Sequence, residues 1–491
     1  MKELDVVIVG AGLSGVGTAV HLQRECPSKT YALLESRAAL GGTWDLYRYP
    51  GIRSDSDMHT LGYDFKPWKA EKSIADGPAI LDYVNEAADE FDVRRHILFN
   101  RSLENAQWSS EDAQWTLDIV DSTGGEAKRE TIRCNMLLMC TGYYSYDEPY
   151  RPHFEGEEDF EGPMFHPQMW PEDLDYKDKR IAVIGSGATA MTVVPSIARD
   201  AAHVTMIQRS PTYVASRPAK DAIANALRKF LPESVAYSLT RAKNVFLQGR
   251  VYQKTRTSPE MVKNYLLGEV RKNLGPQYDV KKHFTPSYNP WDQRLCLIPD
   301  GDLFKAINSG KTTMITDHID RITKGGIRMV SGEEVDADII VVATGLNLKL
   351  LGGVQFSVDD QPVHFPDTWS YKGMMYSDVP NLVQTFGYIN ASWTLRADLT
   401  ARYACRLINR MDELGRRECV PRLREEDMDM VERPWIDDFP AGYMKRGMHL
   451  FPKQSDQEPW LNTQNYAYDK KMIRNAPLED GALHFSHASH K

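Results

Sequence analysis

Two glycine-rich turns are the residues of this chain whose types and spacing most directly indicate chemistry. The first, G-A-G-L-S-G at 10–15, follows the apolar run Asp5–Val9, and the second, G-S-G-A-T-A at 185–190, follows Arg180–Ile184. A helix that begins on glycine lets backbone N–H groups approach a phosphate, because any Cβ would block the approach. The residues expected at the two pyrophosphates are Gly10, Gly12, Ser14 and Gly15 in the first turn and Gly185, Ser186, Gly187, Ala188 and Thr189 in the second.

The residue that ends the second strand of each unit indicates which nucleotide binds there. Glu35 ends the strand Tyr31–Glu35, 20 residues after Gly15, where a carboxylate accepts hydrogen bonds from ribose hydroxyls. Arg209 follows the strand His203–Gln208 instead. A guanidinium binds a 2′-phosphate, and loss of such a contact, ~1.5–3 kcal/mol, changes nucleotide preference by one to two orders of magnitude. The second turn is therefore predicted to select NADPH; the alternative, that Arg209 is only a surface cation, stays open.

The elements that position these turns predict an α/β fold. The chain has 491 residues, too many for one hydrophobic core, and its two strand–turn–helix–strand units predict two Rossmann-like, three-layer domains. Between 216 and 275, alanine, leucine and basic residues dominate, which predicts a helical insertion with a helix start at Ser258-Pro259. Its basic surplus fits a solvated face or a part of the substrate entrance. The expected domains are 1–145 with 346–491, 146–215 with 276–345, and the insertion 216–275.

Composition restricts the classes of partner. Lys and Arg number 59 against 68 Asp and Glu, and the net charge of −9 disfavours nucleic acid and offers no polybasic membrane anchor. The longest apolar runs are strand-sized, and no signal peptide precedes the strand that begins at Asp5, so we expect a cytoplasmic protein without a transmembrane segment. The six cysteines have no metal-binding spacing, so we expect no metal. Cys134 and Cys140 lie six residues apart on one expected strand, and this even spacing predicts buried packing for both.

Two further segments carry motifs with a family resemblance. Phe160, Gly162, His166, Trp170 and Pro171 form F-x-G-x-x-x-H-x-x-x-W-P, which resembles the fingerprint of type I Baeyer–Villiger flavin monooxygenases. Residues 42–55 are similar to the family's second signature, G-x-W-x-x-x-R-[YF]-P-G-x-x-x-D. With N-P-W-D-Q-R-L-C at 289–296 and N-A-S-W-T-L at 390–395, the chain is most similar to the ethionamide-activating branch.

The resemblance implies cofactors and roles for the motif residues. FAD would occupy the first turn, in the domain 1–145 with 346–491, and NADPH the second. Thr43, Trp44, Asp45 and Leu46 would line the flavin, and Arg53, Ser54 and Asp55 would lie near the nicotinamide. Arg294 would be the catalytic arginine, oriented by Asp55. The residue before it is Gln293, where the family commonly has lysine, so more of the 2′-phosphate contact would fall to Arg209 and Ser210.

The implied reaction converts a ketone and O2 to an ester or lactone, and the branch also implies sulfide and thioamide S-oxygenation. Reduced flavin adds dioxygen at C4a, and a permanent cation such as Arg294 stabilises the peroxyanion and the tetrahedral adduct. A flavin monooxygenase that hydroxylates nitrogen or sulfur is the alternative enzyme, and a non-catalytic NADPH-sensing flavoprotein the alternative of another class. The identity of the ketone or sulfide and the oligomeric state are left open by the sequence.

Three residues near these motifs keep alternative interpretations. His166 suits a linker role between the domains better than direct proton transfer, because its segment is stiffened by prolines. Trp460 fits a loop over bound NADP⁺ or core packing about equally well. A helix start near Asn390–Trp393 would point its positive end at the flavin pyrimidine ring.

Overall fold

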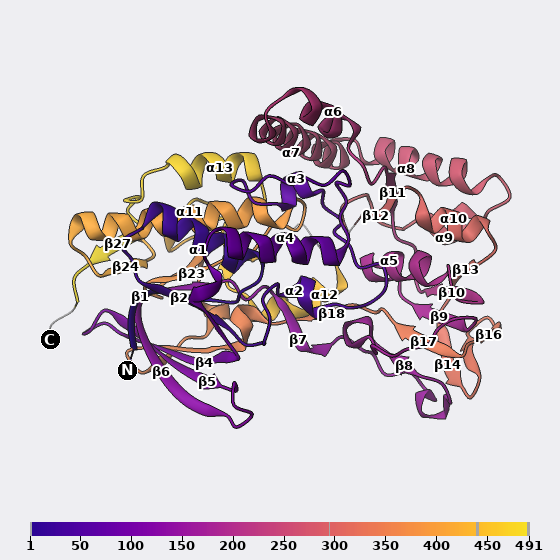
Figure 1. Ribbon diagram of the computed structural model, residues 1–491, viewed down its shortest axis with the longest axis horizontal. Helices are drawn as coiled ribbons and strands as arrows, with labels where there is room; N and C mark the ends of the chain where they lie inside the picture. Colours follow the sequence, from indigo (N-terminus) through magenta and orange to yellow (C-terminus); the bar gives the residue numbers. More distant parts are fainter. Residues whose placement is uncertain (1, 294, 438–440, 489–491) are drawn as a thin grey trace.

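The computed structural model describes residues 2–293, 295–437 and 441–488, and it has two sheets side by side (Figure 1). Helices cover one face of each of these sheets. The chain ends lie at the far side of the larger sheet, and a group of helices projects above the junction between the two sheets (Figure 1). No helix among the described residues is long and apolar enough to cross a membrane.

The larger sheet is built around β1, whose apolar residues are buried on both faces. Val6 of β1 pairs in parallel with Met136 on one side and with Tyr31 on the other. The strands lie in the order β20 (Gln361–Pro362), β19 (Gln355–Val358), β4 (Arg101–Ser109), β5 (Gln114–Asp121), β6 (Lys128–Met139), β1 (Lys2–Val9), β2 (Tyr31–Glu35) and β3 (Ile97–Phe99), with β23 (Leu382–Gln384) also paired with β6.

Three helices cover one face of this sheet: α1 (Leu13–Glu25), α4 (Gly77–Glu90) and α11 (Trp393–Leu414). On the other side of β1 and β2, their buried residues share one hydrophobic cluster with residues of β4, β5 and β19, which belong to the same sheet. The six cysteines are buried and form no disulfide, and the buried packing expected for Cys134 and Cys140 is confirmed. α1 begins directly after the first glycine turn, so this layer fixes the direction in which the turn presents its N–H groups.

The smaller sheet repeats the arrangement with parallel strands only. Its strands lie in the order β13 (Thr312–Thr316), β10 (His203–Gln208), β9 (Arg180–Ile184), β17 (Ile339–Val342) and β8 (Met164–Phe165). One face packs on α5 (Ala188–Ile197), α8 (Pro259–Leu274), α9 (Val280–Phe284) and α10 (Asp302–Asn308). The other face packs on the antiparallel strands β14 (Ile319–Thr323), β15 (Gly326–Met329) and β16 (Glu334–Asp336). The α/β class and the three-layer units agree with the sequence-based expectation.

Two chain crossings join the sheets. β7 (Tyr144–Pro149) leaves the larger sheet after β6, and β18 (Leu346–Leu348) returns after β17. The two crossings pair with each other as antiparallel strands, with Leu346 opposite Pro149. A paired connection restrains the relative position of the sheets more strongly than two separate loops would.

The expected helical insertion consists of α6 (Ala222–Phe230), α7 (Glu233–Thr257) and α8. Asp221 caps α6 by accepting from the Ala224 N–H at 2.9 Å. α8 begins at Pro259 as expected, but the hydroxyl of the N-cap residue Ser258 makes no capping hydrogen bond. α6 and α7 project from the top of the molecule in the view of Figure 1, and α7 contacts α3 (Met58–Leu61) of the larger domain.

Candidate active site

The first glycine turn forms an open cradle at the start of α1. Gly10 has φ +100°, and a Cβ there would lie 2.6 Å from the Cys140 carbonyl oxygen. A Cβ at Gly15 would lie 1.8 Å from the Gly10 oxygen, so both positions require glycine for close backbone packing. Gly12 precedes α1, and no side chain caps the helix. The N–H groups at this end therefore remain available for an anion such as a pyrophosphate.

A second helix begins beside the same cradle. α11 starts at Trp393, whose indole N–H donates to the Ser14 hydroxyl oxygen at 2.7 Å. The two helices run parallel, since His21 meets Asp398 and Lys29 meets Asp412 further along. Their positive ends therefore lie together, which favours negative charge between them. The helix start expected near Asn390–Trp393 is present.

Glu35 closes the cradle from the end of β2. One carboxylate oxygen accepts from the Ala11 N–H at 2.9 Å and the other from the Arg37 N–H at 2.9 Å. Burial raises the pKa of Glu35, although these N–H donors oppose the shift. The oxygen that accepts from Ala11 has a second lone pair, so the carboxylate can hold the turn and still accept from a ribose hydroxyl.

The segment 41–55 connects the two glycine turns. At its start Gly42 packs on Gly12, where a Cβ would lie 3.5 Å from the Gly42 Cα. Thr43 to Leu46 form the short helix α2 (Thr43–Leu46). The Asp45 carboxylate pairs with Arg37 and, at 2.8 Å, with Arg48, so it is held by cations. The half-buried Trp44 packs against the core under α1.

The other end of this segment lies against α5, in the second unit. A Cβ on Gly51 would lie 1.8 Å from the Ser196 hydroxyl oxygen. The Arg53 guanidinium pairs with Asp302 and donates to the Met191 carbonyl at 3.4 Å. Buried Ser54 accepts from the Ser56 N–H at 2.9 Å. In this structure Arg53 and Ser54 hold the loop in place, and Asp302 is a partner that the sequence did not indicate.

The insertion helix α7 grips the residues that follow Asp55. Asp57 caps α3 and also accepts from Asn244 at 2.9 Å and from Gln248 at 3.1 Å. At the other end of α3, Arg241 donates to the carbonyl oxygen of Gly62 at 2.7 Å. Burial alone would raise the pKa of Asp57, but donors from His59, Asn244 and Thr60 outweigh it and lower the pKa. α7 thus fixes α3 at both ends, directly after Asp55.

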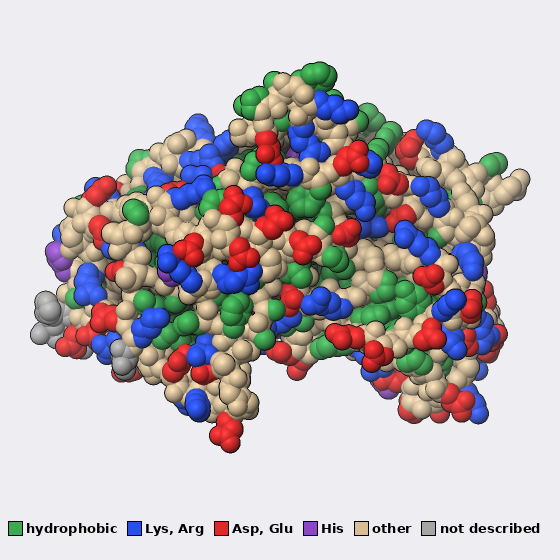
Figure 2. Space-filling model, in the orientation of Figure 1, with side chains coloured by type: hydrophobic (Ala, Val, Ile, Leu, Met, Phe, Trp, Pro, Cys, Tyr) green, Lys and Arg blue, Asp and Glu red, His purple; other side chains and the backbone are tan. Residues whose placement is uncertain are grey.

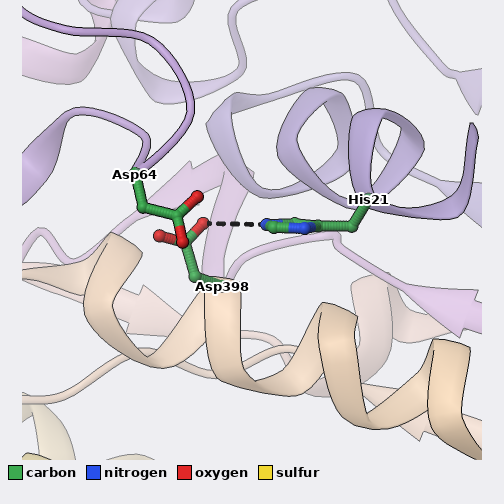
Figure 3. Close-up of side chains that lie close together, drawn as sticks. All are labelled: His21, Asp64 and Asp398. Atoms are coloured by element: carbon green, nitrogen blue, oxygen red, sulfur yellow. Dashed lines mark hydrogen bonds and ion pairs between the residues drawn. The ribbon is translucent and has the colours of Figure 1, made fainter. Parts of the chain in front are cut away.

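A buried charge network lies beneath this contact (Figure 3). His21 contacts Asp398 at 3.4 Å. A ring nitrogen of His21 and one carboxylate oxygen each of Asp64 and Asp398 lie within 4.8 Å of one another. Arg241 donates to Asp398 at 3.1 Å, and Arg402 donates to Asp64 at 2.9 Å. Burial lowers the pKa of His21, but bonds to Asp398 and Glu25 outweigh burial and raise it to about 9. Cations of the protein already occupy these carboxylates, so the cluster is an ion-pair network that joins α1, α7 and α11.

The second glycine turn is open where a phosphate would approach. A Cβ on Gly185 (φ +139°) would lie 2.2 Å from the Ala343 carbonyl oxygen, whereas a Cβ on Gly187 would have no described atom within 4 Å. No side chain caps α5 at Gly187. The Ser186 hydroxyl donates to the Ser210 carbonyl at 3.2 Å, so these two residues, both expected to contact NADPH, lie next to each other. Arg209 is exposed and forms no ion pair with any described residue.

The fingerprint segment 160–171 makes hydrogen bonds to both chain crossings, the one at β7 and the one at β18. His166 Nε2 donates to the Gly345 carbonyl at 2.9 Å, and Nδ1 accepts from the Gln168 N–H at 3.1 Å. The Gln168 side chain donates to the Ser145 carbonyl at 3.0 Å and to the Tyr146 carbonyl at 2.7 Å. Burial lowers the pKa of His166 to about 4, so its imidazole is neutral at pH 7. These contacts support the linker interpretation of His166 over direct proton transfer.

The remaining fingerprint residues pack the same junction. A Cβ on Gly162 would lie 2.3 Å from the Asp338 carbonyl oxygen. Phe160 packs under the strands β14–β16, and Trp170 makes an edge contact with Phe165 at 5.2 Å between ring centroids. Pro171 is exposed. Sequence reasoning missed Gln168, which occupies a variable position of the fingerprint.

Arg294 lies outside the described residues, but the loop before it is placed. Trp291 and Asn390 line one small cavity together with Ile436 and Gln464, so this loop lies beside the start of α11. Arg256 of α7 holds the loop by pairing with Asp292 at 3.1 Å and donating to the Pro290 carbonyl at 3.0 Å. The segment that precedes Arg294 thus lies on the same side of the molecule as the first glycine turn.

Trp460 is not at this site. Its side chain is fully buried in the core of the larger domain, with its ring 5.8 Å from that of Tyr371. Core packing therefore explains Trp460, and the alternative of a loop over the nicotinamide is not supported by this structure.

Comparisons with known proteins identify the family of the chain. Residues 8–70 match the family of NAD(P)-binding Rossmann-like domains, and residues 71–269 match the flavin-binding monooxygenase-like family. The FAD-containing monooxygenase EthA of Mycobacterium tuberculosis is 50% identical over 99% of this chain and 98% of its own length. MymA of the same species, a putative FAD-containing monooxygenase, is 46% identical over 99% of this chain. AlmA of Acinetobacter baylyi, a probable FAD-binding monooxygenase, is 45% identical over 99% of this chain and 96% of its own length.

Solved structures share the fold at lower identity. An oxidized steroid monooxygenase bound to NADP superposes with a TM-score of 0.79 at 21% identity, over 99% of this chain and all of that chain. A cyclohexanone monooxygenase superposes with a TM-score of 0.75 at 18% identity over 99% of this chain. OTEMO in complex with FAD and NADP superposes with a TM-score of 0.74 at 20% identity over 98% of this chain.

Proposed function

This chain belongs to the FAD-containing monooxygenases, and on that premise we propose that it inserts one oxygen atom of O2 next to a ketone carbonyl. The resemblance to the ethionamide-activating branch is confirmed by the identity to EthA, and the enzyme uses FAD and NADPH. In the proposed reaction a ketone, O2, NADPH and a proton give an ester or lactone, water and NADP⁺. When bound, reduced flavin supplies the electrons that activate O2.

The proposal assigns each cofactor to one sheet. FAD would lie in the domain formed by 1–145 and 346–491, with its pyrophosphate at the cradle of Gly10, Gly12 and Gly15 and its flavin beside 43–46. NADPH would lie in the domain formed by 146–215 and 276–345, with its pyrophosphate at Gly187. The supporting observation is the segment 41–55, which packs on Gly12 at one end and on α5 at the other. Asp55 is carried by the part of this segment that faces the second unit.

We assign the oxygen-insertion step to Arg294 and propose that Asp55 orients the Arg294 side chain. A guanidinium keeps its proton at all working pH values, so it stabilises negative charge on oxygen in a site that excludes water. The loop 289–293 lies beside the start of α11 and is tied to α7, and α7 also fixes α3 after Asp55. One helix thus supports both segments that would carry the catalytic pair.

Oxygenation of sulfides and thioamides is a second proposed activity, supported by the 50% identity to EthA over nearly the whole chain. A flavin monooxygenase specific for nitrogen or sulfur remains the alternative. Product analysis on cyclic, aryl and long-chain ketones next to sulfides and amines separates the two. Turnover of sulfides and amines without any ester from a ketone would favour the alternative.

Arg294→Ala tests the mechanism directly. Flavin reduction by NADPH without oxygen is expected to change less than twofold, whereas ester formation falls about 10²–10³-fold, as when an oxyanion donor is removed. Stopped-flow absorbance measures the first quantity and gas chromatography the second. Arg250→Ala, which removes an exposed guanidinium from α7, is the matched control and retains both. Undiminished ester yield in Arg294→Ala would refute the assigned role.

A further inference from the structure

The apolar face of α6 points away from the protein. Ile223, Leu227 and Phe230 recur at spacings of four and three, so they share one face of the helix. The exposed fraction is 56% for Ile223 and 84% for Phe230. The opposite side attaches α6 to the protein through buried Ala224 and through Arg228, which donates to the Lys69 carbonyl. An amphipathic helix of a soluble domain normally turns its apolar face inward, so the outward orientation of α6 marks a candidate interaction surface.

α7 presents a second apolar stripe beside the first. Val235, Leu239 and Phe246 lie along its outer side, and 64% of Phe246 is exposed. The inner side of the same helix carries Tyr237 and Arg241, which contact α3 and its surroundings. Nine of the fourteen large hydrophobic side chains that are exposed in the described chain lie between 223 and 265. The apolar surface is therefore concentrated on the insertion.

The insertion is also strongly basic. Residues 222–274 contain ten Lys or Arg against three Glu, a net charge of +7 in a chain whose net charge is −9. Lys229, Arg250 and Lys254 are exposed and form no ion pair with a described residue. Hydrophobic and basic side chains lie next to one another on the projecting part of the molecule formed by α6 and α7 (Figure 2).

We propose that the outer surface of α6 and α7 docks on an anionic lipid bilayer. Exposed apolar side chains flanked by Lys and Arg are the pattern of a helix that lies in the bilayer interface, where apolar groups enter the acyl region and cations meet the headgroups. A second copy of this chain fits less well, because a two-fold contact would bring the exposed cations Lys229, Arg250 and Lys254 of both copies together. An anionic lipid surface supplies the negative charge that the outer surface of α6 and α7 lacks.

The position of this surface has a consequence for substrate supply, which rests on the proposed function. The inner side of α7 holds α3 and the loop 289–292, the two segments next to the proposed catalytic pair. An enzyme docked through α6 and α7 would have this side of its site nearest the membrane. Ketones and sulfides that partition into lipid are therefore the substrate class that this geometry favours.

Flotation of the FAD-loaded protein with vesicles tests the docking. We expect binding to phosphatidylcholine mixed with phosphatidylglycerol, weak binding to phosphatidylcholine alone, and release at high salt. Phe230→Ser and Phe246→Ser are each expected to lower the partition coefficient about tenfold, because each removes an exposed aromatic ring that the bilayer would bury. Replacement of Lys229, Arg250 and Lys254 by Gln is expected to lower it about 10²-fold.

Matched controls come from the exposed apolar residues outside the insertion. Val330→Ser and Met428→Ser remove side chains that are 64% and 71% exposed, and they should bind vesicles like the parent. Bound FAD and NADPH oxidation without lipid verify that each variant folds and separate this test from failure of the proposed reaction. Equal binding to neutral vesicles, no binding at low salt, or equal loss in the controls would overturn the docking. So would a lipid-free dimer, seen by light scattering, that Phe246→Ser dissociates.

Discussion

Gly187→Ala separates the ligand role of a glycine from its structural role. A Cβ at this position has no described atom within 4 Å, and the backbone φ of −81° is open to any residue. Stability is therefore expected to change by less than about 1 kcal/mol. The new methyl group would occupy the space before the N-terminus of α5, where the proposed pyrophosphate lies. Loss of one charge-assisted contact, ~1.5–3 kcal/mol, raises the Kd for NADPH roughly 10- to 100-fold.

The measurement combines calorimetry of NADP⁺ binding, the KM for NADPH, the melting temperature and the FAD content. Only the first two should change in Gly187→Ala. Gly185→Ala, two residues earlier, is the contrast: its Cβ would lie 2.2 Å from the Ala343 oxygen at φ +139°, so we expect loss of folded protein. An unchanged KM in a folded Gly187→Ala enzyme would show that the nucleotide does not use this helix end.

Three further predictions concern single side chains. Arg209→Ala should lower the ratio of kcat/KM for NADPH over NADH about 10- to 100-fold, and an unchanged ratio would leave Arg209 as a surface cation. His166 has a folded pKa of about 4 against 6.5 unfolded, so its contribution is complete above pH 6.5 and is lost as pH falls toward 4. The free energy of unfolding, measured with urea, should therefore fall by about 3 kcal/mol as the pH falls from 6.5 toward 4, and His166→Gln should abolish this part of the pH dependence. If the variant kept the full pH dependence, the assignment to His166 would be wrong. Arg241→Met should lower the free energy of unfolding by about 3–5 kcal/mol, because Asp398 and the α3 carbonyls then lack their donor. The control Arg250→Met on the same helix should change the free energy of unfolding by no more than about 0.5 kcal/mol. A loss of less than about 1 kcal/mol in Arg241→Met would show that Arg241 does not hold α3 in place.

Features encoded by neighbouring residues could be predicted from the sequence. The strand, turn and helix around Gly10 and those around Gly185 each lie within about 30 residues, so strand burial, glycine geometry and helix start reinforce one another. The start of α11 at Trp393 and the helical character of the insertion followed from local patterns in the same way. For the same reason Cys134 and Cys140, six residues apart on one expected strand, could be expected to be buried.

Features that depend on distant contacts could not be predicted. The pairing of Arg53 with Asp302 and the grip of Arg241 on α3 join segments that are far apart in sequence, and no local pattern indicates either contact. The basic surplus of the insertion was visible, but whether the apolar face of α6 pointed inward or outward required the tertiary structure. Trp460 shows the same limit, because both of its interpretations fitted the sequence and burial decided between them.

The parallel pairing of α1 with α11 has a consequence for synthesis. The Trp393 indole that holds Ser14 is separated from it by 379 positions. At about 5–20 residues per second, a ribosome delivers the partner roughly 20 to 75 seconds after the first glycine turn has emerged. During that interval the side of α1 that packs on α11 is uncovered. Tight flavin capture should therefore begin only when the last hundred residues arrive.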